Sequence, residues 1–267
     1  MPILADHHMH TPLCQHATGP MEDYIERGIE RGLRAVGFSD HNPLPDGLGA
    51  NVRMKESELD YYVQRVLDLR YQYRGKIDVL LGLELDYIPG LESYLEKQIA
   101  RYPWDYIIGS VHYMDPDCRV GSWSRHFTGD VDEHYARYFQ LIRQLATSGL
   151  CDILAHFDVV KRTGHAPTPR ALEEAKRTLE AIAPTGLCIE INTSGYRHPE
   201  LPEPQPYPSL PLALHAHQLG IPLLVNSDAH APDQVAMKFA EMESWLKQNN
   251  CRRLVQFSER KKESYAL

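Results

Sequence analysis

Six short apolar segments of this sequence end in histidine or carboxylate residues, the side chains that bind metal ions in many proteins. One such residue inside a protein is more often structural than a ligand. Six segments that all end this way are not explained by packing, because burying so many ionisable groups without a cation is costly for each of them. We therefore expect a metal site. The candidate residues are Asp6, His8, His10, Asp40, His41, Glu84, Asp86, His112, His156, Asp228 and His230.

The spacing at two of these segment ends indicates ligands that act together. Residues two apart on a strand face the same side. His8 and His10 are therefore expected to bind in one region, and so are Asp228 and His230. His7 is then expected to face the other way and to pack. Imidazole and carboxylate ligands suit zinc, iron or manganese and need no thiolate.

Seven apolar runs rich in Val, Ile and Leu are expected to be strands buried on both faces. Helical patterns alternate with them, which predicts parallel strands joined by right-handed crossovers. A closed barrel leaves no unpaired edge, and the carboxyl ends of its strands meet at one mouth. We predict a distorted (β/α)7 TIM-like barrel, a single domain over residues 1–267, with the metal site at that mouth. The runs cover residues 3–8, 35–39, 77–85, 106–111, 152–155, 187–192 and 222–227.

The helical patterns carry several end signals. Ser57 is the expected N-cap of a helix over residues 57–74, and Gly149 is expected to end one over residues 132–148. Thr168 followed by Pro169 predicts another helix start. Further helices fit residues 91–101, 210–218 and 234–247. The Gly- and Pro-rich segment 42–55 directly follows His41, so we interpret it as a loop over the site, with a plain connector as the alternative.

Composition limits the class of protein. The net charge of −8 argues against bulk nucleic-acid binding, although local metal ions can still attract an anionic substrate. The first residues resemble no signal peptide, and no apolar stretch is long enough to cross a membrane. Five cysteines without a C-x-x-C pair predict reduced thiols in a cytoplasmic protein, with Cys14 as a packing residue. Oligomeric state stays open.

In order, spacing and residue type, the ligand segments resemble the motifs of PHP-domain (polymerase and histidinol phosphatase) phosphoesterases over essentially the whole chain. Residues 39–45, 82–90 and 105–112 are similar in particular to the histidinol-phosphate phosphatase branch, which acts in histidine biosynthesis. The opening motif is Asp6-His7-His8-Met9-His10-Thr11, with His16 downstream. The later motifs are Ser39-Asp40-His41, Gly82-Leu83-Glu84, Ser110-Val111-His112, Ala155-His156 and Ser227-Asp228-Ala229-His230.

The resemblance implies a distorted (β/α)7 barrel with three divalent ions per chain, drawn from zinc, iron and manganese. It also implies that L-histidinol phosphate is hydrolysed to L-histidinol and inorganic phosphate. By position, the first ion would be bound by His8, His10, Glu84 and Asp228. The second would be bound by Glu84, His112 and His156, and the third by His16, His41 and His230.

Hydrolysis of a phosphate monoester needs a nucleophile at neutral pH and neutralised charge on the phosphoryl oxygens. We hypothesise that a hydroxide bridging the first two ions attacks phosphorus in line. Glu84, Asp228 and Arg197 are the predicted catalytic residues. Arg197 follows the one strand without a predicted ligand, and its guanidinium is expected to bind phosphoryl oxygens. A plain surface arginine is the alternative.

The remaining substrate residues are less defined by the sequence. Lys161 and Arg162 are second choices for the phosphate, and Asp40 and Asp86 are expected to orient ligand histidines. Tyr113 is a predicted substrate residue. The loop aromatics expected either to stack on an imidazole or to pack are Tyr113, Trp123, Phe127 and Tyr196.

Three rival functions stay open. The first is a related phosphoesterase for another small phosphate monoester or a nucleotide. The second is an amidohydrolase, which also opens with H-x-H on a barrel strand but usually carries a carboxylated lysine that we do not find at the strand ends. The third is a non-catalytic metal-binding protein. A panel of substrates, with a metal count per chain, separates them.

Overall fold

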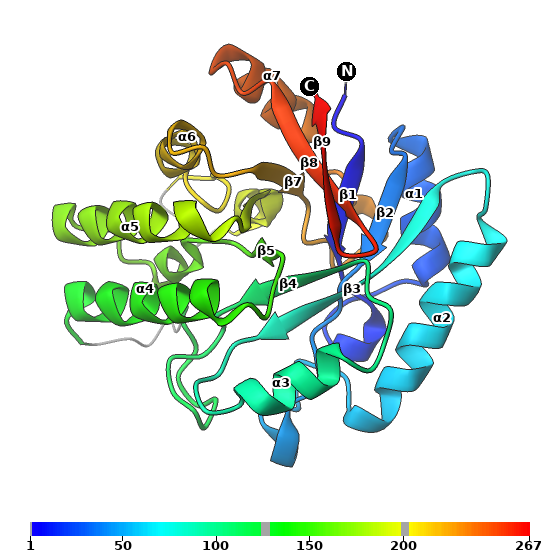
Figure 1. Ribbon diagram of the computed structural model, residues 1–267, viewed down its shortest axis with the longest axis horizontal. Coiled ribbons are helices and arrows are strands. Elements are labelled where there is room, and N and C mark those ends of the chain that lie inside the picture. The colour runs from blue at the N-terminus through cyan, green and yellow to red at the C-terminus, as the bar shows by residue number, and fades with distance from the viewer. Residues whose placement is uncertain (1, 124–128, 199–202) are drawn as a thin grey trace.

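Seven parallel strands form the barrel on which the chain is built (Figure 1). The computed structural model describes residues 2–123, 129–198 and 203–267. The strands are hydrogen-bonded to one another in chain order, which confirms the predicted (β/α)7 topology. They are β1 (Ala5–Met9), β2 (Ala35–Phe38), β3 (Asp78–Asp86), β4 (Tyr106–Ser110), β5 (Ile153–Leu154), β6 (Cys188–Asn192) and β7 (Leu223–Asn226).

The barrel closes where β7 meets β1, and the closure is irregular. A parallel bridge joins Met9 to Ala229, just beyond the end of β7. Further down, the backbone N–H of His7 donates to the side-chain oxygen of Asn226 at 2.9 Å, where a regular ladder would use a backbone carbonyl. The register of β1 also shifts between Asp6 and Met9. The barrel is therefore distorted at this seam, as the seven-strand count predicted.

Seven helices in the described part of the chain surround the strands (Figure 1). Two predicted ends are confirmed: Thr168 accepts from the Ala171 N–H, and Gly149 ends its helix in the left-handed conformation at φ 74°. The N-cap at Ser57 is wrong, because a 3-10 turn occupies Glu56–Glu58 before α2 begins. The helices are α1 (Met21–Glu30), α2 (Leu59–Gln72), α3 (Glu92–Ile99), α4 (Val131–Ser148), α5 (Pro169–Ile182), α6 (Leu210–Gln218) and α7 (Phe239–Gln248).

A C-terminal hairpin that the sequence patterns did not predict covers the amino-terminal end of the barrel. It consists of β8 (Arg253–Ser258) and β9 (Lys261–Ala266), paired antiparallel. Val255 and Phe257 are buried in a cluster with residues from all seven barrel strands. The ring of His7 lies edge-on to Phe257, with centroids 6.4 Å apart, so His7 packs as expected, toward this end of the barrel.

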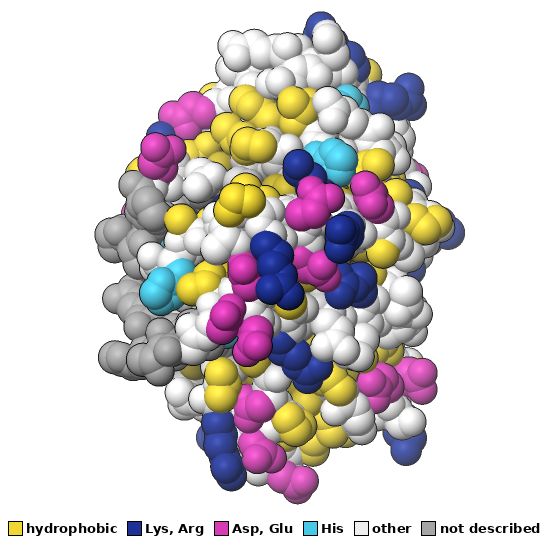
Figure 2. Space-filling view, turned by 90° about the vertical axis from the view of Figure 1, so that its left-hand side faces the viewer, with side chains coloured by type: hydrophobic (Ala, Val, Ile, Leu, Met, Phe, Trp, Pro, Cys, Tyr) yellow, Lys and Arg dark blue, Asp and Glu magenta, His cyan; other side chains and the backbone are white. Residues whose placement is uncertain are grey.

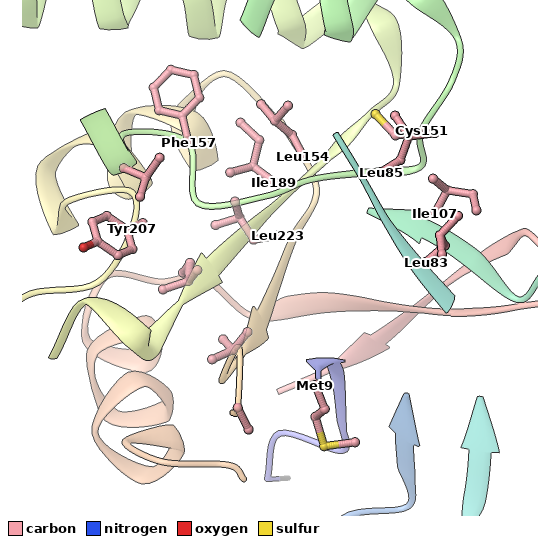
Figure 3. Packing of buried hydrophobic residues seen from close by; sticks show 14 of the residues in the cluster. Met9, Leu83, Leu85, Ile107, Cys151, Leu154, Phe157, Ile189, Tyr207 and Leu223 are labelled. Atoms are coloured by element: carbon pink, nitrogen blue, oxygen red, sulfur yellow. The ribbon is translucent and has the colours of Figure 1, made fainter. Parts of the chain in front are cut away.

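The larger core lies between the strands and the helices (Figure 3). On β3, Leu83 and Leu85 belong to this outer core, while Glu84 between them points the opposite way. Apolar strand residues therefore anchor the helices, and the alternate residues are left to fill the interior and the mouth of the barrel. Outer-core residues labelled in Figure 3 include Met9, Leu83, Leu85, Ile107, Leu154, Ile189 and Leu223.

On the face shown in Figure 2, basic and acidic side chains are interleaved, and no continuous basic patch forms there. Within residues 2–123, 129–198 and 203–267, none of the helices is both long enough and apolar enough to cross a bilayer. All five cysteines are free thiols, and Cys14 is buried.

Candidate metal centre

One carboxylate lies at the centre of the barrel mouth. Glu84, on β3, is buried, and five imidazoles approach its two oxygens. The nitrogen–oxygen distances to Glu84 are 3.5 Å for His8, 3.5 Å for His10, 2.8 Å for His41, 3.4 Å for His112 and 3.2 Å for His156. These five histidines come from four different strands or the residues just after them, so the fold and not local sequence brings them together.

The first predicted ligand set is assembled around Asp228. His10 Nε2 lies 3.2 Å and His8 Nε2 3.7 Å from Asp228 Oδ1. Ligands held tetrahedrally at roughly 2.1 Å from an ion are separated by about 3.4 Å from one another. The spacing of these atoms therefore matches the edge of a metal-binding polyhedron.

The second and third sets are also brought together. Glu84, His112 and His156 offer atoms within 4.8 Å of one another, and so do His16, His41 and His230. In the second set, the two Nε2 atoms of His112 and His156 are 3.2 Å apart. In the third, the Nε2 atoms of His16 and His230 are 3.0 Å apart. The structure thus places all nine predicted ligands at one mouth.

Cys14 lies closer to this centre than a packing role requires. It belongs to a group with His10 and His230 whose possible ligand atoms also lie within 4.8 Å of one another. The sequence suggested only packing for this thiol. The three predicted ligand sets are complete without it, so we keep it as a neighbour of the site.

Several buried polar atoms at the mouth fit a bound cation. Among the described residues, four buried atoms that face the centre lie near one another but make no well-formed hydrogen bond: His8 Nε2, His10 Nε2, His41 Nδ1 and Glu84 Oε2. All four belong to the predicted ligands. Orphaned buried acceptors are costly unless something satisfies them, and divalent ions would do so. The residues present therefore fit the metal ions that the sequence predicts.

The electrostatics of the mouth point the same way. Burial by itself would raise the pKa of Glu84, but the neighbouring imidazoles of His41, His112 and His8 hold it well below its usual value. Burial likewise opposes ionisation of Asp228, whose pKa His8 and His10 lower strongly. Burial lowers the pKa of His41 to about 4. Against the effect of burial, Glu190 and Asp228 raise the pKa of His8 well above its usual value. The centre therefore sets ionised carboxylates against imidazoles, and a bound metal ion would take the place of the imidazole protons.

Two of the predicted ligand histidines lie against the carboxylates that the sequence analysis expects to orient them. His112 Nδ1 lies 2.8 Å from Asp86 Oδ1, and His10 Nδ1 lies 3.4 Å from Asp40 Oδ1. In each case the nitrogen that faces away from the centre has an anionic partner, which leaves Nε2 to face the centre. Asp86 also binds the guanidinium of Arg53 at 2.5 Å.

Glu190, on β6, is a third carboxylate of this kind, and the sequence analysis missed it. Its Oε2 lies 3.0 Å from His8 Nδ1. In the sequence analysis β6 is the one strand without a predicted ligand, because Glu190 stands in mid-strand and not at the strand end. The available signal was an acid between Ile189 and Ile191 in a run expected to be buried on both faces.

A cavity of about 710 Å³ opens above the ligand cluster. Val52 and Arg53 line it. The segment 42–55 is therefore a loop at the site and not a plain connector. Two predicted substrate residues, Arg162 and Tyr113, also line the cavity. The guanidinium of Arg162 lies over the ring of Trp123, 5.2 Å from its centroid. The lining residues include His16, His41, Arg53, Tyr113, Trp123, Arg162, Arg197 and Asp228.

Arg197 reaches the cavity while holding the loop after β7. Its two terminal nitrogens donate to the carbonyl oxygens of Ser227 at 2.9 Å and Asp228 at 2.6 Å. Asp228 has a left-handed backbone, φ 52°, which is unusual for a residue other than glycine. Since a guanidinium carries five N–H donors, Arg197 can fix the backbone of a ligand and still offer donors to the cavity.

The structure does not support Lys161 as a phosphate residue. Its ammonium is buried, lies 3.0 Å from Asp158 Oδ1 and donates to the Pro206 carbonyl at 2.8 Å. The ammonium is therefore paired with Asp158, and Lys161 is not among the residues that line the cavity. Tyr196 is likewise not among the residues that line the cavity. Phe127, like His126, lies outside the described residues.

The sequence of residues 6–194 matches the family model of the PHP domain. The chain belongs to the PHP family. A relative described as a probable histidinol-phosphatase, from Deinococcus radiodurans, is 37% identical over 247 residues, which is 89% of this chain and 90% of the relative. The histidinol-phosphatase of Bacillus subtilis is 29% identical over 269 residues, covering 88% and 96% of the two chains.

Solved structures show the same PHP fold. The histidinol phosphate phosphatase of Lactococcus lactis, complexed with zinc, L-histidinol and phosphate, matches with a TM-score of 0.79 and 19% identity, over 97% of this chain and 98% of that one. The putative histidinol phosphatase of Listeria monocytogenes matches equally well, with a TM-score of 0.79 at 20% identity over 89% and 99% of the two chains. At these identities the likeness establishes the shared barrel.

Proposed function

We propose that this PHP protein is a metal-dependent phosphatase that hydrolyses L-histidinol phosphate to L-histidinol and inorganic phosphate. The observation that carries the proposal is the convergence of five imidazoles on Glu84, with Asp228 completing the first ligand set. The names of relatives similar over nearly the full chain support the substrate. The reaction belongs to histidine biosynthesis, a cytoplasmic setting in which five free thiols stay reduced.

Three divalent ions of zinc, iron or manganese would be held by the three ligand sets. Glu84 belongs to the first and second sets, and its Oε1 lies near both His8 and His112, so it would be shared between the two sets. When bound, such ions supply positive charge for the phosphoryl oxygens and a nucleophile that is active at neutral pH. Glu84, which is buried, and Asp228 would contribute the negative charge that holds these ions.

Substrate binding is assigned to residues of the cavity wall. Arg197 would bind phosphoryl oxygens with the N–H groups that its two backbone contacts leave available. Arg162 lies on the same wall and would be a second cationic group near the phosphate. Tyr113 and Trp123 present aromatic surface to the cavity, which suits a planar imidazole.

The test is phosphate release from a panel of monoesters by the metal-loaded protein. L-Histidinol phosphate is expected to be the best substrate, and Asp228→Ala is expected to lose nearly all activity because the first ligand set is broken. Arg197→Ala should mainly raise KM for phosphorylated substrates. Near-full activity of Asp228→Ala in metal-replete buffer would contradict the proposed centre. Hydrolysis of amides or lactams with none of phosphate esters would favour an amidohydrolase instead.

A further inference from the structure

We propose that Glu190 is a positioning residue that fixes His8 in the one orientation and tautomer in which its Nε2 can bind the first ion. The inference rests on the proposed metal centre and adds to it a residue outside the nine predicted ligands. Glu190 contributes no predicted ligand atom. It acts instead through the ring of His8 and through the backbone N–H of His156, a predicted ligand of the second ion.

Glu190 is a fully buried carboxylate at the centre of a hydrogen-bond network. It stands on β6, and its side chain points into the barrel, whereas Ile189 and Ile191 on either side belong to the outer core. Its Oε2 lies 3.0 Å from His8 Nδ1, and its Oε1 accepts from the backbone N–H of His156 at 2.9 Å. One carboxylate thus contacts a ligand of the first set and the chain at a ligand of the second.

The contacts of His8 determine where its ring proton lies. Within residues 2–123, 129–198 and 203–267, Nδ1 of His8 contacts only the Glu190 carboxylate, and an ionised carboxylate can only accept a hydrogen bond. Nδ1 therefore carries the proton and donates it to Glu190. In the neutral ring Nε2 then has a free lone pair, and this atom points toward Glu84 at 3.5 Å and Asp228 at 3.7 Å. The tautomer that Glu190 selects is the one that a metal ligand must have.

Two asparagines keep Glu190 in place and connect it to the opposite side of the ion position. Asn226 Nδ2 donates to Oε2 at 2.8 Å, and Asn192 Nδ2 donates to Oε1 at 2.7 Å. The Asn192 amide also donates to Asp228 Oδ2 at 3.2 Å. Carboxylate, histidine, ligand aspartate and asparagine therefore form a closed ring of contacts around the first ligand set.

A purely structural role does not explain this arrangement. Burying a carboxylate in a strand costs desolvation free energy, and an apolar residue would fill the barrel interior without that cost. The donors that satisfy Glu190 are supplied by a ligand ring, by a ligand backbone and by two amides, one of which also holds Asp228. The geometry therefore fits a group retained for the ligands it orients.

The test uses Glu190→Gln, which keeps the size of the side chain but offers only one accepting oxygen to these donors. Its amide N–H₂ would favour the other tautomer of His8, with the proton on Nε2, where it blocks metal binding. We expect the affinity for the first zinc ion to fall about 10- to 100-fold, while the other two ions stay bound. The readouts are zinc per chain after dialysis at fixed free zinc, and competition with a chromogenic chelator.

Two further variants make the result decisive. Glu190→Asp keeps the negative charge with a shorter reach and is expected to lose affinity by less than Glu190→Gln, and it serves if the glutamine variant does not fold. Asp105→Asn is the matched control, because Asp105 is a buried carboxylate at the other end of the barrel that accepts from the Leu81 N–H at 2.7 Å. It should lower thermal stability without changing zinc affinity.

The outcomes separate the inference from the proposed centre. Three ions bound by folded Glu190→Gln with wild-type affinity would overturn the positioning role. An equal loss of zinc in Asp105→Asn would also overturn it, since general destabilisation would then explain the effect. Wild-type protein that binds zinc but prefers another phosphate ester would refute the proposed substrate and leave the role of Glu190 intact.

Discussion

Replacing Arg53 with methionine tests whether the loop over the cavity is locked to the metal centre by a buried ion pair. Arg53 lies in the segment 42–55, is 2% exposed, and contacts Asp86 at 2.5 Å, whose side chain is 1% exposed. Asp86 in turn orients His112. Methionine fills much of the space of the arginine stem but leaves the carboxylate of Asp86 without its cation.

The structure sets the size of the expected effect. Removing one partner of a buried ion pair costs about 3–5 kcal/mol, because the remaining charge stays buried. Asp86 keeps its contacts with His112, which argues for about 3 kcal/mol from the pair itself. Arg53 also donates to the carbonyls of Asn42 at 2.8 Å and Gly49 at 3.2 Å, and each lost bond adds about 1 kcal/mol. The total of about 5 kcal/mol corresponds to a Tm lower by about 10 °C.

The assay combines urea unfolding of the zinc-loaded protein with steady-state kinetics. We also expect kcat/KM to fall about tenfold, since His112 loses part of its support. Arg27→Met is the control, because Arg27 pairs with Glu30 at 2.8 Å on the surface of α1, with the two side chains 37% and 63% exposed. It should cost less than about 0.5 kcal/mol. If Arg53→Met cost no more than the control, the pair would have to be solvated, and the argument for a locked loop would be refuted.

Two further predictions concern groups away from the ligands. Lys161→Met should lower the free energy of unfolding by about 3 kcal/mol, because it leaves Asp158 buried without its partner, yet change KM by less than about twofold; a tenfold rise in KM would reinstate Lys161 as a phosphate ligand. For His134, burial and nearby His165 lower the pKa below its ordinary 6.5, against the hydrogen bond that it donates to Ser122. Below pH 6.5 this residue therefore binds more protons in the unfolded chain than in the folded chain, and its contribution to stability falls as the pH drops. Unfolding curves between about pH 7.5 and 5 should show a smaller loss for His134→Gln than for the wild type; identical slopes would contradict this reasoning.

Local patterns in the sequence were enough to predict the barrel and the candidate metal ligands. Alternation within a strand is a local property, so the sequence already placed His8 and His10 on one side of a strand and His7 on the other. The common position of the ligand candidates at strand ends then predicted one mouth, because parallel strands in a barrel all end on the same side. The start of α5 at Thr168 and the end of α4 at Gly149 could be predicted because both signals lie in residues adjacent in the chain.

Only the tertiary structure decided which groups stand behind the ligands and which cations face the cavity. His8 meets Glu190 across 182 positions of sequence, and no spacing rule links two residues so far apart. The same holds for Lys161, whose charge is taken up by Asp158 and by a carbonyl 45 residues away, although its position just after a ligand strand suggested a phosphate contact. The hairpin β8–β9 is stable because the open base of the barrel offers apolar surface to Val255 and Phe257, a surface that exists only after the strands have assembled. The type of each side chain and the spacing of apolar residues can be read from the sequence. The contacts of each side chain depend on which surfaces the closed barrel brings together.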